Sequence, residues 1–195
     1  MPILRELLID QLQDLFHAES QLTNALPKMA NAAHNPKLKE AFTKHLQQTE
    51  THVERLRMVF ADLGETAQGK PCKAMQGLIA EGEETIQEGR DKGEVASDLA
   101  LIAAAQRVEH YEISAYGTAR SLARQLGAVQ SARLLSHTLG EEEGADFLLT
   151  AISDPLVQNA SLQDVGADAD LEGASLPHRG KRRSGSSEKR GQEAA

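Results

Sequence analysis

Apolar residues recur at helical spacing along four long stretches of this chain, and this periodicity constrains the fold more than any other feature. Between residues 36 and 63, positions three and four apart form one stripe, which consists of Phe42, Leu46, Thr49, Val53, Leu56, Phe60 and Leu63. A stripe of this kind is typical of a helix that buries one face in a bundle. The alternation of every second residue that indicates a β-strand is absent from the sequence. The sequence therefore predicts an all-α fold.

Residues that favour helix ends mark the limits of each helix. Four long helices are expected over residues 3–31, 36–63, 97–127 and 129–153, and a shorter one over residues 74–88. Pro36 suits the first turn of a helix, and Gly64 and Gly127 suit the residue that follows one. We expect Ser97 to cap the start of the third long helix. We expect the fourth to stop before Pro155, because proline cannot donate a backbone hydrogen bond.

The lengths of the connections predict how these helices pair. Only residues 126–128 join the third and fourth long helices, so these two must pack antiparallel. The connection over residues 64–95 is long enough to cross the length of a bundle and to carry the short helix. Two antiparallel hairpins joined by one long crossover form the ferritin-like type of four-helix bundle. This is the fold we expect.

The C-terminal part of the chain differs from the rest in composition. Residues 164–172 are acidic, and residues 179–190 are basic with glycine and serine between the charges. Such a segment cannot bury enough apolar surface to offset the entropy of ordering it. We therefore expect a folded domain over residues 1–155 and a disordered tail over residues 156–195. Because the net charge is −8, nucleic-acid contact is expected only through the basic run, which otherwise serves as a solubilising tail.

Cysteine content and hydropathy narrow the classes of protein and site. Cys72 is the only cysteine, so an internal disulfide and a cysteine-based zinc or iron–sulfur site are excluded. The same scarcity fits a reducing compartment. No apolar run approaches the roughly 18 residues of a membrane span, and the N-terminal residues lack the pattern of a signal peptide. We expect a soluble, cytoplasmic protein that does not enter the membrane.

Acidic residues stand at positions where the apolar stripes predict a core. The first long helix has one glutamate in its stripe, the third has two, and the fourth has a glutamate and an aspartate. These residues are Glu19, Glu109, Glu112, Glu142 and Asp146. The second long helix places Thr49 on its seam at this height, with His45 and His52 on one flank. His52 lies one helical turn from Thr49, and it is the histidine whose side chain we expect to point into the core.

These acidic side chains all lie near the middle of their helices. Antiparallel packing at a rise of about 1.5 Å per residue would bring them to one level. Five carboxylates in a buried layer would be intolerable alone, because each unpaired buried charge costs several kcal/mol. A single buried glutamate is commonly protonated or partly exposed, but agreement among three helices favours bound cations. Carboxylates with an imidazole suit iron or manganese, and we expect two such ions per chain.

Three stretches of sequence closely resemble the YciE/YciF-type ferritin-like stress proteins. They are LQDLFHAESQL at residues 12–22, CKAMQGLI at residues 72–79 and VEHYEISAYGT at residues 108–118, the last being the most specific. Thr138 and Leu139, followed by Glu141, Glu142 and Asp146, also look like that family. The resemblance covers residues 3–153. It implies a ferritin-like bundle that is usually paired as a homodimer and is associated with bacterial stress responses.

The wider rubrerythrin relatives imply a ligand set for the metals. They use a Glu on helix one, a Glu-x-x-His on helix two, a Glu-x-x-Glu on helix three, and a Glu followed by a His on helix four. The residues of this chain that match these positions are Glu19, His52, Glu109, Glu112 and Glu142. Thr49 stands in place of the helix-two Glu, and Asp146 stands where the last His would be. Gln48 or Glu50 could compensate for Thr49.

These observations lead to three hypotheses of function. The first is a di-iron or di-manganese oxidoreductase, of peroxidase or ferroxidase type, that acts on peroxide, oxygen or ferrous ion. Because the chain has no rubredoxin-like cysteine pairs, its electrons would come from an external donor or from ferrous ion. The alternative is a non-catalytic stress or interaction protein with a decayed metal site, which Thr49 favours. The third is a ferritin-like storage cage, against which the tail and the family resemblance argue.

Overall fold

The computed structural model describes the backbone of residues 3–174, and the side chains as far as residue 162. Within this range the chain forms helices and no strand. The helices are α1 (Ile3–Ala32), α2 (Pro36–Asp62), α3 (Lys73–Gly89), α4 (Glu94–Gln125) and α5 (Val129–Ala174). The chain divides into two compact units at residues 1–160 and 161–195. The first unit is the helical bundle, and the described part of the second, residues 161–174, continues α5.

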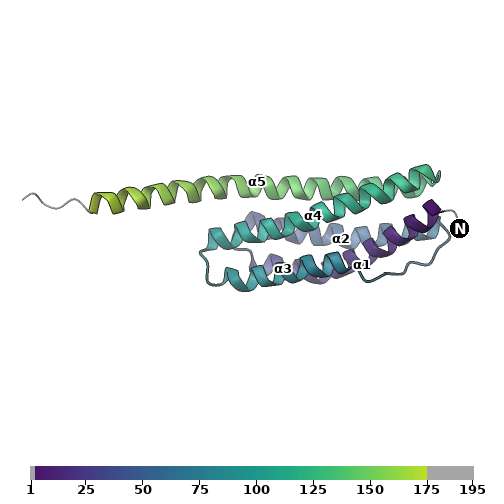
Figure 1. The fold of residues 1–195 in the computed structure, drawn as a ribbon, viewed down its shortest axis with the longest axis horizontal. Helices are drawn as coiled ribbons and strands as arrows, with labels where there is room; N and C mark the ends of the chain where they lie inside the picture. Colours follow the sequence, from purple (N-terminus) through teal and green to yellow (C-terminus); the bar gives the residue numbers. More distant parts are fainter. Residues whose placement is uncertain (1–2, 175–195) are drawn as a thin grey trace, which may run out of the picture. The chain divides into compact units, whose positions relative to one another are not determined.

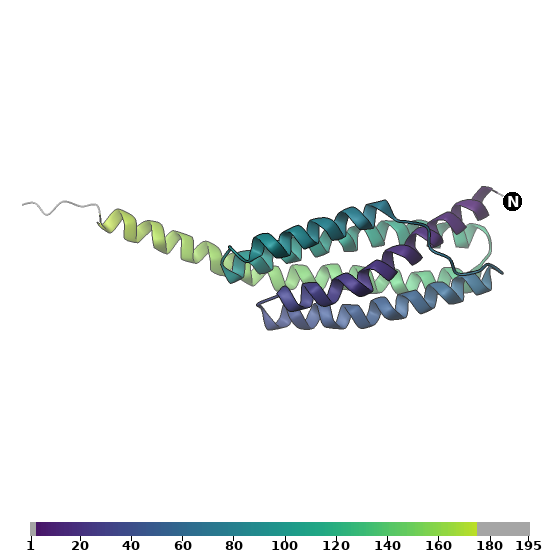
Figure 2. The same cartoon turned by 90° about the horizontal axis from the view of Figure 1, so that it is seen from below.

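The bundle has the expected ferritin-like topology. Helices α1 and α2 form one antiparallel hairpin, and α4 and α5 form the other (Figure 1). Helix α2 ends at one end of the bundle and α4 begins at the opposite end, so the connection between them runs along its length (Figure 2). This connection carries α3, which packs against α4 and α1. None of the described helices is long and apolar enough to cross a membrane.

Local sequence explains most of the helix ends. The side chain of Asn35 caps α2 and accepts a hydrogen bond from the backbone N–H of Lys37 at 2.9 Å. Gly64 and Gly127 both have a φ of +70°, a left-handed conformation that glycine adopts without a steric penalty. The expected cap at Ser97 is wrong. Helix α4 begins three residues earlier, after Gly93, and Ser97 lies buried in its first turns.

The expected end of the last helix is also wrong, because α5 continues through Pro155 to Ala174. A proline inside a helix removes one backbone hydrogen bond. Leu156, the residue after Pro155, packs against the apolar core. This burial helps to offset the missing hydrogen bond. Residues 156–174, which we expected to belong to an irregular tail, therefore continue the helix. Residues 175–195, with the basic run, lie outside the described residues, so their disorder and nucleic-acid contact remain predictions.

The core consists of two apolar clusters with a polar layer between them. Along α1, Leu15 belongs to one cluster and Leu22 to the other, and Glu19 lies between them. Along α5, Leu139 and Leu149 belong to different clusters in the same way, and Glu142 lies between them. Helices α2 and α4 repeat the pattern. The predicted common height of Glu19, Glu109, Glu112 and Glu142 thus corresponds to one layer across the bundle.

Candidate metal centre

Six side chains from the four long helices make up the polar layer. None of them is more than 6% exposed. They are Glu19 from α1, His45 and His52 from α2, Glu109 and Glu112 from α4, and Glu142 from α5. We call these six residues the carboxylate–histidine layer.

One half of the layer consists of Glu19, His52 and Glu142. Each of these residues offers one ligand atom, and the three atoms lie within 4.8 Å of one another. His52 Nδ1 is 3.3 Å from Glu19 Oε1 and 2.9 Å from Glu142 Oε1. Two carboxylates and one imidazole nitrogen therefore face a common space that a single cation can occupy.

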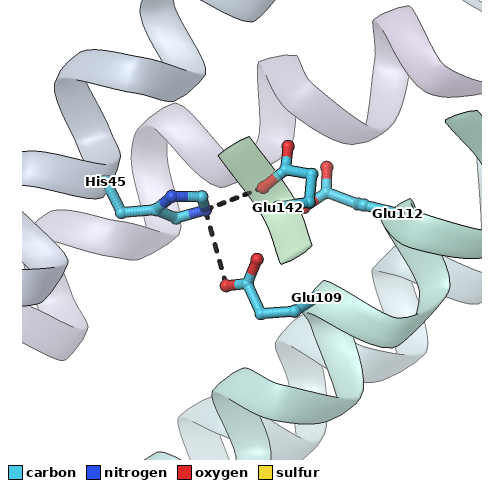
Figure 3. A group of neighbouring side chains, drawn as sticks. All are labelled: His45, Glu109, Glu112 and Glu142. Carbon is cyan, nitrogen blue, oxygen red and sulfur yellow. Dashed lines mark ion pairs between the residues drawn. The ribbon is translucent and has the colours of Figure 1, made fainter. Parts of the chain in front are cut away.

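The other half consists of His45, Glu109, Glu112 and Glu142, whose ligand atoms also lie within 4.8 Å of one another (Figure 3). His45 Nε2 is 3.4 Å from Glu109 Oε1 and 3.5 Å from Glu142 Oε2. Glu142 belongs to both halves. Its Oε1 lies nearest to His52 and its Oε2 lies nearest to His45, so this carboxylate spans two neighbouring spaces.

Glu112 provides the test of whether this layer suits a metal. Its two carboxylate oxygens are buried and have no hydrogen-bond partner in the described part of the chain. Leaving a buried carboxylate without a donor or a cation costs several kcal/mol. Divalent ions would satisfy these oxygens, and the donor set around them consists of carboxylates and imidazoles, which iron and manganese accept. The residues present therefore fit a pair of such ions.

The electrostatics of the metal-free layer are dominated by burial. Burial raises the pKa of Glu19 to about 7, against the opposing hydrogen bond from His52. Burial and then the charge of Glu142 raise the pKa of Glu109 well above its usual range, and burial has the same effect on Glu112. Burial lowers the pKa of His52, but hydrogen bonds to Glu142 and Glu19 outweigh it and raise this pKa to about 10. Without a metal, His52 is therefore the cation of the layer.

Neighbouring groups orient two of the candidate ligands. Tyr116 is fully buried, and its hydroxyl donates a hydrogen bond to Glu19 Oε1. His52 Nε2 lies 3.0 Å from Glu141 Oε2, and Arg55 Nη2 donates to Glu141 Oε1 at 3.1 Å. The Arg55–Glu141 pair thus holds one nitrogen of His52, which leaves Nδ1 directed at Glu19 and Glu142. Such outer partners fix the tautomer and the angle of a histidine ligand.

Comparison with known proteins places the chain in a family. Residues 3–162 match the family model described as "Domain of unknown function (DUF892)". The chain belongs to this family. Protein YciF of Escherichia coli (strain K12) is 46% identical over 154 residues, which are 78% of this chain and 92% of YciF.

Solved structures of relatives have the same fold. The crystal structure of the E. coli stress protein YciF aligns with a TM-score of 0.77 at 42% identity, and the match covers 81% of this chain and 99% of that one. YcfI from Rhodopseudomonas palustris aligns with a TM-score of 0.73 at 40% identity, over 77% and 94% of the two chains. The resemblance inferred from residues 12–22, 72–79 and 108–118 is therefore confirmed, and the chain is similar to a stress protein.

The structure brings together five of the six residues predicted as ligands, and their metal-binding role remains a prediction. The sixth, Asp146, is placed elsewhere, and its assignment to the layer is corrected. Its Oδ1 accepts a hydrogen bond from Gln106 Nε2 at 3.0 Å, and its Oδ2 lies 3.4 Å from His110 Nε2. The side chain is 24% exposed at the α4–α5 edge, and Asp146 belongs to neither of the two groups of ligand atoms.

His45 is the member of the layer that the sequence reasoning left out. The buried face of α2 includes His45, Thr49 and His52, whereas the predicted stripe ran through Leu46 and Val53, which are only partly buried. The available signal was the spacing of seven residues between the two histidines, which places both on one helix face. Thr49 lies between them, and its hydroxyl donates to the backbone carbonyl of His45 at 3.0 Å.

Proposed function

We propose that the carboxylate–histidine layer binds two iron or manganese ions and that the protein uses them in the chemistry of peroxide, dioxygen or ferrous ion. The observation that carries this proposal is the position of Glu142. Its Oε1 lies 2.9 Å from His52 Nδ1 and its Oε2 lies 3.5 Å from His45 Nε2, and the residue belongs to both groups of candidate ligands. A carboxylate shared in this way is what a bridged pair of metal ions requires.

A bound pair of redox-active ions would supply the electrons that reduce peroxide or dioxygen. The protein contributes the surroundings. The two apolar clusters border the layer on both sides along the bundle. Tyr116 holds Glu19, and Glu141 holds His52, so that these ligands keep their orientation. Cys72 is the only cysteine and is not in the layer, so we propose that electrons come from an external donor or from ferrous ion itself.

Metal content tests the proposal directly. Purified protein from cells grown in iron-rich or manganese-rich medium is measured by elemental analysis. The wild type should approach two ions per chain, and Glu142→Ala should lose most of the metal because both halves of the layer lose a ligand. Asp146→Asn is the matched control on the same helix, and it should retain wild-type metal. Fewer than about half an ion per wild-type chain would contradict the proposal, because both halves of the layer are proposed to be occupied.

Thr49 favours a second candidate function, a stress or interaction protein without catalysis. Threonine supplies no carboxylate between His45 and His52, and its hydroxyl is engaged by the backbone of its own helix. The two functions are distinguished by peroxide consumption and ferrous oxidation of the metal-loaded protein, compared with a Glu19→Ala/Glu109→Ala double variant. Equal rates in the two proteins would leave only the structural or binding role.

A further inference from the structure

A small apolar cavity lies beside the carboxylate–histidine layer, among α1, α2, α3 and α4. Its volume is about 40 Å³, and by the same measure a cavity of about 10–15 Å³ can hold one water molecule. Most of its wall is hydrocarbon, and it includes Leu22, Met29, Phe42, Ile79, Ala105 and Val108. A cavity of this size and character admits one small molecule and offers water few hydrogen-bond partners.

Charged and polar residues also contribute to the wall of this cavity. His45 and Glu109, which belong to the half of the layer shown in Figure 3, are among the residues that line it. Lys28 and Glu83 also line it, and their side chains are about half exposed and form an ion pair at 2.6 Å between α1 and α3. The cavity therefore borders both the His45–Glu109 edge of the layer and an ion pair at the surface.

We propose that this cavity binds dioxygen and delivers it to the His45–Glu109 edge. Dioxygen is small, uncharged and nearly without hydrogen-bonding capacity, so it loses no hydrogen bonds when it enters an apolar space. Hydrogen peroxide and metal ions would lose their hydration there at a cost of several kcal/mol. The delivery of dioxygen to a metal rests on the proposed function, whereas the binding of a small apolar gas does not.

A second cavity shows why polar molecules need not take this route. It lies between α2 and α5, has a volume of about 260 Å³, and reaches the same two residues, His45 and Glu109. Its wall includes the polar side chains of Lys44, Gln48 and Glu141. Peroxide and hydrated ions can exchange hydrogen bonds with these groups as they enter. The layer is thus bordered by one cavity with an almost entirely apolar wall and by a second whose wall mixes polar and apolar side chains.

Gly82 offers a way to close the apolar cavity without touching the layer. It lies on the α3 wall of the cavity, and an added Cβ would lie 3.9 Å from Met29 Sδ, which is ordinary van der Waals contact. A Gly82→Leu side chain would therefore extend into the cavity. Gly77 lies on the same helix, is exposed, and has no atom within 4 Å of an added Cβ. Gly77→Leu is the matched control for the same change of residue.

Xenon binding to the metal-free, full-length protein is the test, because xenon enters apolar cavities of this kind. Xenon NMR should show saturable binding in the wild type and in Gly77→Leu. In Gly82→Leu the xenon affinity should fall by about tenfold or more, which corresponds to about 1.4 kcal/mol. Circular dichroism establishes that each variant is folded. If Gly82→Leu does not fold, Ala105→Met, from the α4 wall of the cavity, replaces it.

Absence of saturable xenon binding in the wild type would overturn the proposal, and so would unchanged affinity in a folded Gly82→Leu or Ala105→Met. In iron-loaded protein, Gly82→Leu should slow oxidation by dioxygen severalfold and leave oxidation by hydrogen peroxide unchanged. Equal slowing of both reactions would also overturn the proposal. Because the xenon measurement needs no metal, failure of the metal centre alone would leave its outcome intact.

Discussion

At the scale of single residues, we expect metal binding to depend both on the candidate ligands and on the side chains that form hydrogen bonds with them. Glu19 is buried, and Tyr116, His52 and Glu142 lie around it. In the metal-free protein His52 keeps its proton at neutral pH because its pKa is raised to about 10, and Glu19 keeps its proton to a higher pH than an exposed glutamate because its pKa is raised to about 7. A divalent ion would take over the role of these protons, so metal binding should release protons from the layer.

Tyr116→Phe should weaken metal binding and leave the fold intact. The ring stays buried in the apolar cluster, but Glu19 loses the hydroxyl that orients it. Loss of such a partner typically costs about 10- to 100-fold in metal affinity, which competition with a chelator measures. Tyr111→Phe is the control, because the Tyr111 hydroxyl donates to Asp14 and not to a residue of the layer. Equal losses in both variants would contradict the role given to Tyr116.

Metal-free protein should lose stability as the pH rises. The raised pKa of Glu19 means that the folded state keeps a proton that the unfolded state releases between pH 4.5 and about 7, so unfolding becomes easier over that window. The raised pKa of His52 stabilises the fold below pH 6.5, and this contribution is lost as the pH approaches 10. Both effects have the same sign. Burial lowers the pKa of His45, which has the opposite effect on stability, but only below about pH 6.5. Melting temperatures of chelator-treated protein should therefore fall between pH 6.5 and about 10, and a rise over this range would contradict the expectation.

At the scale of helices, contacts between elements supply caps that their own sequences lack. Asp98 lies near the start of α4 and is buried, and its carboxylate accepts hydrogen bonds from the backbone N–H groups of His34 at 2.8 Å and Asn35 at 2.7 Å. It thereby ties the turn between α1 and α2 to the beginning of α4. This one side chain links the two hairpins at the end of the bundle where α4 begins.

Asp98→Ala should lower the free energy of unfolding by about 1–3 kcal/mol, because it leaves two backbone donors unpaired in a partly buried turn. Chemical denaturation measures the change. Asp91→Ala is a suitable control, since Asp91 is exposed and lies in the turn between α3 and α4, and it should change the stability by less than about 0.5 kcal/mol. If the two substitutions changed the free energy of unfolding equally, the hydrogen bonds of Asp98 would contribute little to stability.

At the scale of the whole molecule, the family resemblance implies a homodimer. Light scattering should then give twice the chain mass of 21.1 kDa. A monomer would contradict this expectation, and an assembly of hundreds of kilodaltons would instead support the storage cage. Large apolar side chains remain exposed on the bundle, among them Phe147 at 75% and Met58 at 54% exposure, and burial of such residues is what a stable self-association would use.

Periodicity and turn residues were sufficient to predict the bundle, most helix ends and five members of the carboxylate–histidine layer. Helical spacing assigns a face, and the rise per residue assigns a height, so Glu19, Glu109, Glu112 and Glu142 could be grouped before any contact was known. Gly64 and Gly127 mark helix ends because the left-handed backbone there favours glycine. These are local properties of the chain.

The inclusion of His45, the exclusion of Asp146 and the passage of α5 through Pro155 required the packed molecule. Successive residues turn by about 100° around a helix, so an error of one position in the stripe of α2 moves His45 from the flank into the core. Asp146 is held at the α4–α5 edge by Gln106 and His110, and Leu156 finds its contact in the core. Each outcome depends on how one helix is rotated against its neighbours, which no single helix encodes.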